Sequence, residues 1–484
     1  MSGKIFTGAI IVVAMRWTDR LVGLVSTLVL ARLLVPDDFG VVAMASIYTG
    51  LIDVLLDLGV VAALIHKGKC DSDDYSTAWT VRLLQTALAA LIICATAQFV
   101  ANYYNDQRVT LVLFLMAATT VVGGFENIGI VAFQKDMKFG LDFQFFFLRR
   151  IAGFVSTLAF AWYFESYWAL PIGALIGRLT GVALSYSMHP LRPRLTLKRF
   201  HSIWSLSKWM LIRSIGAYFD SRLDKLIIGG RSDAATIGAY SLADEIAAMP
   251  SSELLAPLGR VLFPAFVEAR DKPQELQRSF LLALSVQAMI ALPAATGLAL
   301  VADDAVVVLL GERWISAIPF VETLAMIYGV TAISHAAGYL LLTLGKIRSM
   351  AIFIWIQVGL FALGALTFFL HSTPLAIAQW RLVVTACSVM GFVAMVVISV
   401  ETLKAQHILA AVWRPSIATV MMALVLYALP FDDLTPLASL LLRCCLGGAS
   451  YTVFLIGLWL ISGRPTGGES YILGKLMPFI RRQS

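Results

Sequence analysis

The side chains of this chain that could do chemistry are ionised residues inside long apolar stretches. An ionised side chain facing lipid at mid-membrane costs at least about 2.5–3.5 kcal/mol. Each one must therefore face a water-filled cavity or a partner of opposite charge. Candidate cavity cations are Arg16, Arg20, Arg149, Arg150, Arg178 and Arg213. Candidate coupling-ion or ion-pair acids are Asp19, Asp53, Asp57, Asp220, Asp224, Asp244 and Glu253.

Basic residues exceed acidic ones in the first half of the chain. This half contains five of the candidate cations, all except Arg213. The acids expected to pair with them are only three, Asp19, Asp53 and Asp57. An unpaired cationic excess requires an anion, and a guanidinium binds phosphate through a planar pair of donors. The pattern predicts a phosphate-bearing guest. The alternative is that the charges pair as salt bridges that lock helices together, as Arg16 with Asp53 would.

Apolar segments must position these charges. The mean hydropathy is +0.82, and only 14% of residues are charged. A hydrocarbon core of about 30 Å is crossed by a helix of roughly 20 residues, and fourteen segments are long enough. These predicted helices are 5–34, 38–65, 76–103, 108–134, 139–164, 167–188, 203–230, 235–264, 278–301, 315–344, 349–370, 375–400, 408–430 and 437–462.

The loops between these segments alternate in charge. One set is basic, with Arg192, Arg194 and Lys198 as an example, and the other is acidic, with Asp303 and Asp304. By the positive-inside bias, the basic loops and both termini are cytoplasmic. The net charge of +7 is mostly this loop bias, so it does not argue for nucleic acid.

The segments group into two halves. We expect an N-lobe of six helices (1–189), a cytoplasmic linker (190–202), a C-lobe of six helices (203–402), and two further helices with a cytoplasmic tail (403–484). Since six is even, the two lobes share one orientation, the parallel-repeat arrangement of some transporters. The fold class is thus an all-α polytopic membrane protein with two lobes around a central cavity. No stretch between the predicted helices is long enough to form a soluble domain with a core of its own.

Two prolines inside predicted helices are candidate hinges. Pro250 and Pro293 each remove a backbone donor, and a static kink is the alternative to a hinge. The cysteines show no metal-ligand spacing with histidines, and no glycine-rich phosphate loop is present. We therefore expect no metal site, no cofactor, no catalytic residues and no ATP-driven pump.

Short motifs in the first four hundred residues resemble a known family. In the first half they are Leu30–Leu34 with Pro36, Asp38, Phe39 and Gly40, then Asp57 with Gly59, and Lys135 with Met137, Lys138 and Phe139. In the second half they are Asp224, Lys225, Gly229, Gly238, Tyr240, Pro250, Arg260–Pro264, Gly311 and Trp314. Their order and spacing resemble the polysaccharide transporter branch of the multidrug/oligosaccharidyl-lipid/polysaccharide (MOP) flippase superfamily, close to colanic acid exporters.

The resemblance implies a fourteen-helix, two-lobed flippase of the bacterial inner membrane, similar to multidrug exporters in fold. Such a protein moves an undecaprenyl diphosphate-linked oligosaccharide, a polysaccharide repeat unit, to the outer leaflet by alternating access. It is not an enzyme. Expected partners are the lipid-linked oligosaccharide and membrane lipids, with a polysaccharide polymerase and export machinery as further candidates, and we expect a monomer.

The acids of the second half depart from the family pattern. They either bind coupling cations or pair internally with Arg213, Arg222 and Lys225. Two other functions also remain alternatives. A cation-coupled multidrug exporter shares the superfamily, although the arginines argue against a cationic guest. A membrane glycosyltransferase or polymerase would need a larger polar outer loop than this chain has.

Overall fold

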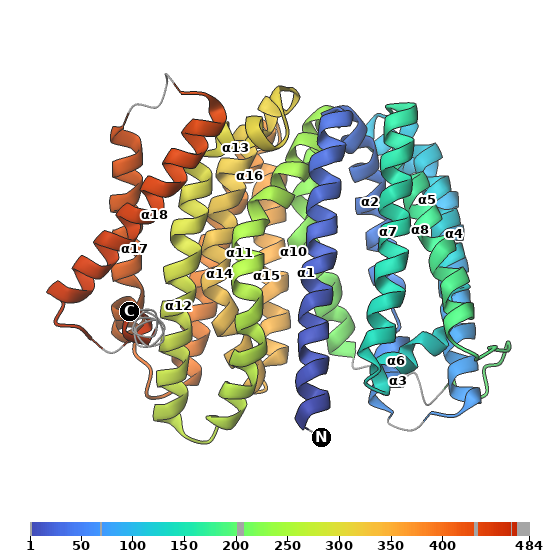
Figure 1. Ribbon diagram of the computed structural model, residues 1–484, viewed down its shortest axis with the longest axis horizontal. Helices are drawn as coiled ribbons and strands as arrows, with labels where there is room; N and C mark the ends of the chain where they lie inside the picture. Colours follow the sequence, from blue (N-terminus) through green and yellow to red (C-terminus); the bar gives the residue numbers. More distant parts are fainter. Residues whose placement is uncertain (1, 68–69, 201–207, 430–433, 466, 472–484) are drawn as a thin grey trace. The chain divides into compact units, whose positions relative to one another are not determined.

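The computed structural model describes residues 2–67, 70–200, 208–429, 434–465 and 467–471, and the regular secondary structure of these residues is helical. The chain forms two compact units, residues 1–238 and 239–484 (Figure 1). Helices dominate because a membrane offers the backbone no water to bond, so each segment satisfies its own N–H and C=O groups.

The first unit contains the helices of the first half and one more. They are α1 (Ser2–Leu33), α2 (Pro36–Leu56), α3 (Val60–His66), α4 (Ser72–Tyr104), α5 (Arg108–Gly124), η1 (Ile128–Ile130), α6 (Val131–Lys135), α7 (Phe139–Phe164), α8 (Ala169–Met188) and α10 (Lys208–Gly229). Helix α10 packs on α2, where the Tyr218 hydroxyl donates a hydrogen bond to the Ile47 carbonyl.

The second unit contains the remaining helices. They are α11 (Ala234–Glu268, whose first residues belong to the first unit), α12 (Pro273–Leu300), α13 (Ala302–Leu309), η2 (Glu312–Ala317), α14 (Ile318–Thr343), α15 (Ile347–Thr367), α16 (Pro374–Ser399), α17 (Ala405–Ala428) and α18 (Pro436–Ile461). Proline occupies the first turn of α12, α14, α16 and α18, where its missing N–H leaves no intrahelical bond unmade.

Every predicted segment contains a helix. Ten helices in the described ranges are long and apolar enough to span a membrane, and α5 with η1–α6 forms an eleventh candidate if that bent pair is one span. Helices α1, α10 and α11 are not among these ten. The all-α polytopic fold class is thus confirmed, whereas the count of fourteen spans stays a prediction.

Two predicted continuous helices, 38–65 and 108–134, are broken, and the expectation of single helices there was wrong. The first breaks between α2 and α3, where Gly59 has φ 62°, a left-handed conformation that favours glycine. The second breaks after α5, and the chain turns by 64° before η1 and α6. The lobe boundaries at the linker stay a prediction. The hinges at Pro250 and Pro293 also stay a prediction. Helix α11 continues through Pro250, and helix α12 continues through Pro293.

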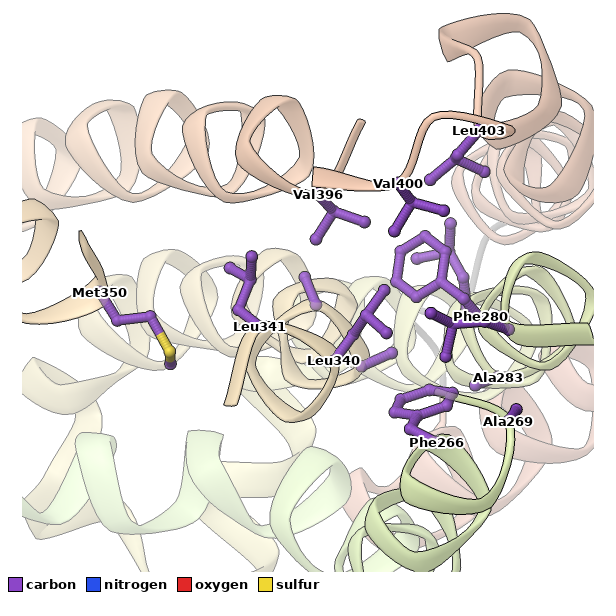
Figure 2. Packing of buried hydrophobic residues seen from close by; sticks show 14 residues of the cluster. Phe266, Ala269, Phe280, Ala283, Leu340, Leu341, Met350, Val396, Val400 and Leu403 are labelled. Atoms are coloured by element: carbon purple, nitrogen blue, oxygen red, sulfur yellow. The ribbon is translucent and has the colours of Figure 1, made fainter. Parts of the chain in front are cut away.

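The second unit is held by a core of buried apolar side chains. Figure 2 shows the phenyl rings of Phe266 and Phe280 near Leu340, with Val396 and Val400 close by. These residues come from α11, α12, α14, α16 and the residue after α16. The core therefore ties together four helices at the end where α11 leads into α12.

Other large apolar side chains are exposed. Phe99, Trp162, Phe368, Ile398 and Tyr427 are all more than 75% exposed. A protein in water would leave few such side chains in contact with solvent, whereas lipid accepts them. These faces are the ones that contact the hydrocarbon core.

Candidate functional site

Three arginines of the first unit surround one buried carboxylate. Glu126 is only 3% exposed. Arg149 Nη1 donates a hydrogen bond to Glu126 Oε2 at 3.1 Å. Arg82 Nη2 lies 3.8 Å from Glu126 Oε1, and Arg178 Nη1 lies 4.0 Å from Oε2. We call Arg82, Glu126, Arg149 and Arg178 the arginine cluster.

Glu126 owes its position to the broken span. It follows the last turn of α5, and the next residue, Asn127, fixes the turn. The Asn127 backbone N–H donates to Ser185 Oγ of α8 at 2.9 Å, and its side-chain amide donates to the Leu191 carbonyl at 2.7 Å. Its side-chain oxygen accepts from the Gly129 N–H at 2.9 Å. Irregular backbone at membrane depth needs such partners, and broken helices are where transporters place binding sites.

The cluster lies near the middle of its helices. Arg82 and Arg149 are each ten residues from the first residue of α4 and α7, and Arg178 is ten residues from the last residue of α8. At a rise of 1.5 Å per residue, each arginine is about 15 Å from a helix end. By the predicted topology these three ends are all cytoplasmic, so the guanidiniums share one depth near the bilayer centre.

Small residues allow the helices to approach closely enough. A Cβ on Gly181 of α8 would lie 2.7 Å from Arg149 Cδ, so the arginine stem crosses α8 where there is no side chain. A Cβ on Gly124 at the end of α5 would clash with Thr86 Oγ1 of α4. Substitution at either glycine would push the helices apart and move an arginine away from Glu126.

The cluster carries more positive than negative charge. Three guanidiniums and one carboxylate give a formal charge of +2. The arginine side chains are 24%, 25% and 40% exposed, so they remain accessible while the carboxylate is buried. Guanidinium N–H groups that one carboxylate does not occupy can bind the oxygens of an anionic guest.

Sequence reasoning found two of the three arginines and missed Arg82 and Glu126. Arg82 is the one basic residue inside the predicted helix 76–103, which was a usable signal. Glu126 follows two glycines inside the predicted helix 108–134, so it was an acid in an apolar segment. The pairing itself was not predictable, because it depends on the turn that follows α5.

The other candidate cations are placed elsewhere. Arg150 Nε lies 3.3 Å from Asp19 Oδ1, and both side chains are at least half exposed. Arg213 Nε is buried, and no described residue forms a hydrogen bond with it. Arg20 is half-buried on α1. The side chains of Arg16 and Glu253 lie outside the described residues.

The first pair of candidate acids lies beside a small cavity of the first unit. Asp53, Asp57, Gln85 and Thr86 are among the residues that line its volume of about 280 Å³. Asp57 Oδ1 also accepts a hydrogen bond from the Gly59 N–H at 2.8 Å, so this carboxylate caps the break after α2. That contact gives Asp57 a structural role.

The remaining acids lie on α10 and α11. Asp220 is half-buried, and Asp224 is 1% exposed beside the equally buried Lys225. Asp244, in the second unit, accepts a hydrogen bond from the Tyr328 hydroxyl at 2.6 Å. Within the described ranges, no group of three or more His, Cys, Asp or Glu side chains is arranged to hold a metal ion.

Comparison with known proteins identifies relatives. A family model described as "Polysaccharide biosynthesis protein" matches residues 29–319. The chain is 24% identical over 333 residues to the lipopolysaccharide biosynthesis protein WzxC of Escherichia coli (strain K12). The matched region covers 67% of each protein. The chain is 24% identical over 437 residues to the succinoglycan biosynthesis transport protein ExoT of Rhizobium meliloti (strain 1021), which covers 88% of each.

Two solved structures share the fold. A lipid II flippase, MurJ, in an inward closed conformation superposes with a TM-score of 0.76 at 12% identity, covering 96% of this chain and 99% of that chain. An inward-facing multidrug resistance MATE transporter of the MOP superfamily superposes with a TM-score of 0.57 at 13% identity, covering 80% and 96%. These likenesses confirm the predicted MOP-type architecture.

The family match covers more than half of the chain and confirms the resemblance predicted from short motifs. With ten apolar helices long enough to span in the described residues, the chain is a multi-pass protein of the bacterial inner membrane. The chain belongs to the polysaccharide biosynthesis protein family.

Proposed function

We propose that this protein flips an undecaprenyl diphosphate-linked oligosaccharide across the inner membrane, and that the arginine cluster binds the diphosphate. The observation that carries the proposal is the convergence of Arg82, Arg149 and Arg178 on Glu126 at a broken span. The formal charge of +2 matches the two ionised oxygens of a diphosphate diester. The chain performs transport and is not an enzyme.

Glu126 gives the cluster a way to release its guest. In the empty site the carboxylate keeps three guanidiniums together that would otherwise repel one another. When a diphosphate enters, its oxygens take up the donor groups that Glu126 does not fill. Since the carboxylate stays nearby and competes for the same donors, the diphosphate is held without being trapped, as alternating access requires.

The relatives' names support the transported class. ExoT is named as a succinoglycan biosynthesis transport protein, and the relative Agl15 of Haloferax volcanii as a probable low-salt glycan biosynthesis flippase. By the loop charges, both termini of this chain face the cytoplasm. Its lobes divide at residues 190–202 and move about Pro250 and Pro293. A polysaccharide polymerase and export machinery are further partners, and the protein works as a monomer.

The other candidate charges have supporting roles in this proposal. Arg16, Arg20, Arg150 and Arg213 line the path as further cations. The exposed pair of Arg150 and Asp19 requires an aqueous surface, because an ionised pair facing lipid at mid-membrane would be costly. The candidate acids serve as coupling-ion sites or ion-pair partners; they are Asp53, Asp57, Asp220, Asp224, Asp244 and Glu253.

The experiment measures export of the lipid-linked sugar by cells that carry variants of the cluster, with membrane abundance checked in each. Arg82, Arg149 and Arg178 are changed one at a time to lysine and to glutamine. We expect lysine to retain part of the export, because it keeps the charge, and glutamine to abolish it. Arg199→Gln is the matched control, since this arginine lies outside the predicted spans and near Asp71.

Normal export by all three glutamine variants would overturn the assignment of the diphosphate to this cluster. Recovery of export in an Arg149→Gln and Glu126→Gln double variant would instead support a purely structural ion pair. Loss of small-cation export with normal sugar export would favour the multidrug exporter as the function.

A further inference from the structure

A larger cavity lies within the second unit, and none of its described lining residues belongs to the arginine cluster. It occupies about 630 Å³ between α12, α17 and the segment after α18, Pro465 and residues 467–471, of which 468–471 are helical. Its lining follows one stripe of each helix, from Gln274 to Ser285 on α12 and from His407 to Arg414 on α17. Both stripes start near the first residue of their helix, so residues at equal distance from these ends face each other.

The mouth of this cavity is cationic. Arg278 is exposed there, and no described residue forms an ion pair with it. Beside it, Gln277 Nε2 and His407 Nδ1 are 3.0 Å apart and hydrogen-bonded, which fixes α12 against α17. The N-terminal ends of both helices add partial positive charge. No acidic side chain is among the described lining residues.

One turn further in, the lining becomes apolar. Leu281 and Leu282 of α12 face Ala410 and Ala411 of α17. Leu281 and Ala411 also pack on the core shown in Figure 2. A free phosphate ion would gain nothing from these surfaces, whereas a hydrocarbon chain would be desolvated by them.

The inner end holds a polar atom that lacks a partner. Ser285 lines the cavity and is 2% exposed, and its Oγ forms no hydrogen bond with a described residue. A buried hydroxyl without a partner is costly, so such an atom calls for an acceptor beyond the described residues.

The segment after α18 closes the inner end. Arg414 Nε donates to Glu469 Oε1 at 2.7 Å, and the two side chains are 8% and 3% exposed. A Cβ on Gly468 would lie 2.8 Å from Ser285 Oγ, so only a residue without a side chain fits there. Glu469 neutralises Arg414, so that Arg278 is the arginine without an ion-pair partner among the described lining residues.

We propose that this cavity binds the phosphate-bearing headgroup of an anionic membrane phospholipid. The phosphate contacts Arg278 and the helix N-terminal ends at the mouth. The start of an acyl chain lies along Leu281 and Leu282, and an ester carbonyl accepts a hydrogen bond from Ser285 Oγ. The loop charges place this mouth at the cytoplasmic face, where anionic lipids are available. The assignment does not depend on the arginine cluster.

The test titrates the purified, delipidated full chain with phosphatidylglycerol and counts bound lipid by mass spectrometry of the intact complex. We expect Arg278→Gln to weaken binding about tenfold, because a charge-assisted contact is lost. Ser285→Ala should weaken it roughly threefold. Arg270→Gln is the matched control: it removes an exposed arginine between α11 and α12 that does not line the cavity, and binding should not change.

Three further probes separate the sources of phosphate. Phosphatidylcholine should bind about tenfold more weakly than phosphatidylglycerol, because its headgroup is neutral overall. Equal binding of the two lipids, or equal loss in the Arg270 and Arg278 variants, would overturn the proposal. Displacement of phosphatidylglycerol by inorganic phosphate would assign the site to a free anion. Displacement by a low concentration of undecaprenyl diphosphate would assign it to the substrate carrier. Either result also overturns it.

Discussion

Replacement of Glu126 by glutamine removes one negative charge from among three guanidiniums while keeping the shape of the side chain. The three nitrogen–oxygen distances are 3.1, 3.8 and 4.0 Å. At an effective dielectric constant of about 20, each contact supplies roughly 4–5 kcal/mol of gross attraction. Desolvation and repulsion among the arginines offset most of this sum. Since breaking a buried ion pair costs about 3–5 kcal/mol, we expect Glu126→Gln to lower the free energy of unfolding by that amount.

The assay is thermal unfolding of the purified full chain with and without undecaprenyl diphosphate. The matched control is Asp136→Asn, which removes an exposed carboxylate 3.3 Å from Lys138 Nζ and should cost about 0–1 kcal/mol. If a diphosphate binds at the cluster, its charges replace the one that was removed. The ligand should therefore raise the unfolding temperature of Glu126→Gln more than that of the parent chain.

Two results would refute this reasoning. If Glu126→Gln is as stable as Asp136→Asn, the carboxylate is not the counter-ion that holds the arginines. If undecaprenyl diphosphate stabilises the parent chain but not Glu126→Gln, the ligand does not occupy the guanidiniums that Glu126 neutralises. Addition of Arg149→Met to Glu126→Gln should recover part of the stability, because one uncompensated charge is then gone.

Two other ion pairs give separate predictions. Glu469→Gln leaves the buried Arg414 guanidinium without its counter-ion and should cost about 3–5 kcal/mol by thermal unfolding, while a double change of both residues to methionine should recover most of it. In the loop before α5, burial alone would raise the pKa of Asp106, but hydrogen bonds from Arg108 outweigh it and hold the pKa below its usual value. This contribution to stability is present above the unfolded pKa of about 3.9 and is lost as pH falls through the lower folded pKa. Arg108→Gln should therefore lower the unfolding temperature at pH 7, and its difference from the parent chain should shrink below about pH 4; a difference independent of pH would contradict the argument.

Hydropathy and charge were enough to predict the architecture. Each apolar segment contains a helix, because a run of about 20 apolar residues has no other stable form in lipid. The breaks after Leu56 and Gly124 were not predictable in the same way, because apolar residues continue on both sides of each break. The signal at the first was Gly59, whose left-handed φ only becomes evident in the structure.

The site was predicted in part. Arg149 and Arg178 were found because ionised residues at mid-helix are costly unless they face a cavity or a partner. The expected partners were Asp19, Asp53 and Asp57, but the buried acid beside both arginines is Glu126. Sequence distance cannot supply this pairing, since the four residues come from three helices and a turn. Within the cluster three arginines lie around one acid, whereas the wider cationic excess expected of the first half stays a prediction.

A single turn of α4 connects both broken spans. Gln85 Nε2 donates a hydrogen bond to the Leu56 carbonyl, which the end of α2 leaves without a helical partner. Thr86 lies against Gly124 at the end of α5, and Arg82 reaches Glu126 beyond it. Freed backbone groups at this depth need protein partners, and α4 supplies them for one break while it supplies charge for the other. An anion that draws Arg82 away from Glu126 therefore acts on the turn of α4 that also lines the cavity beside Asp53 and Asp57. The proposed diphosphate site and the candidate coupling acids thus share one rigid element.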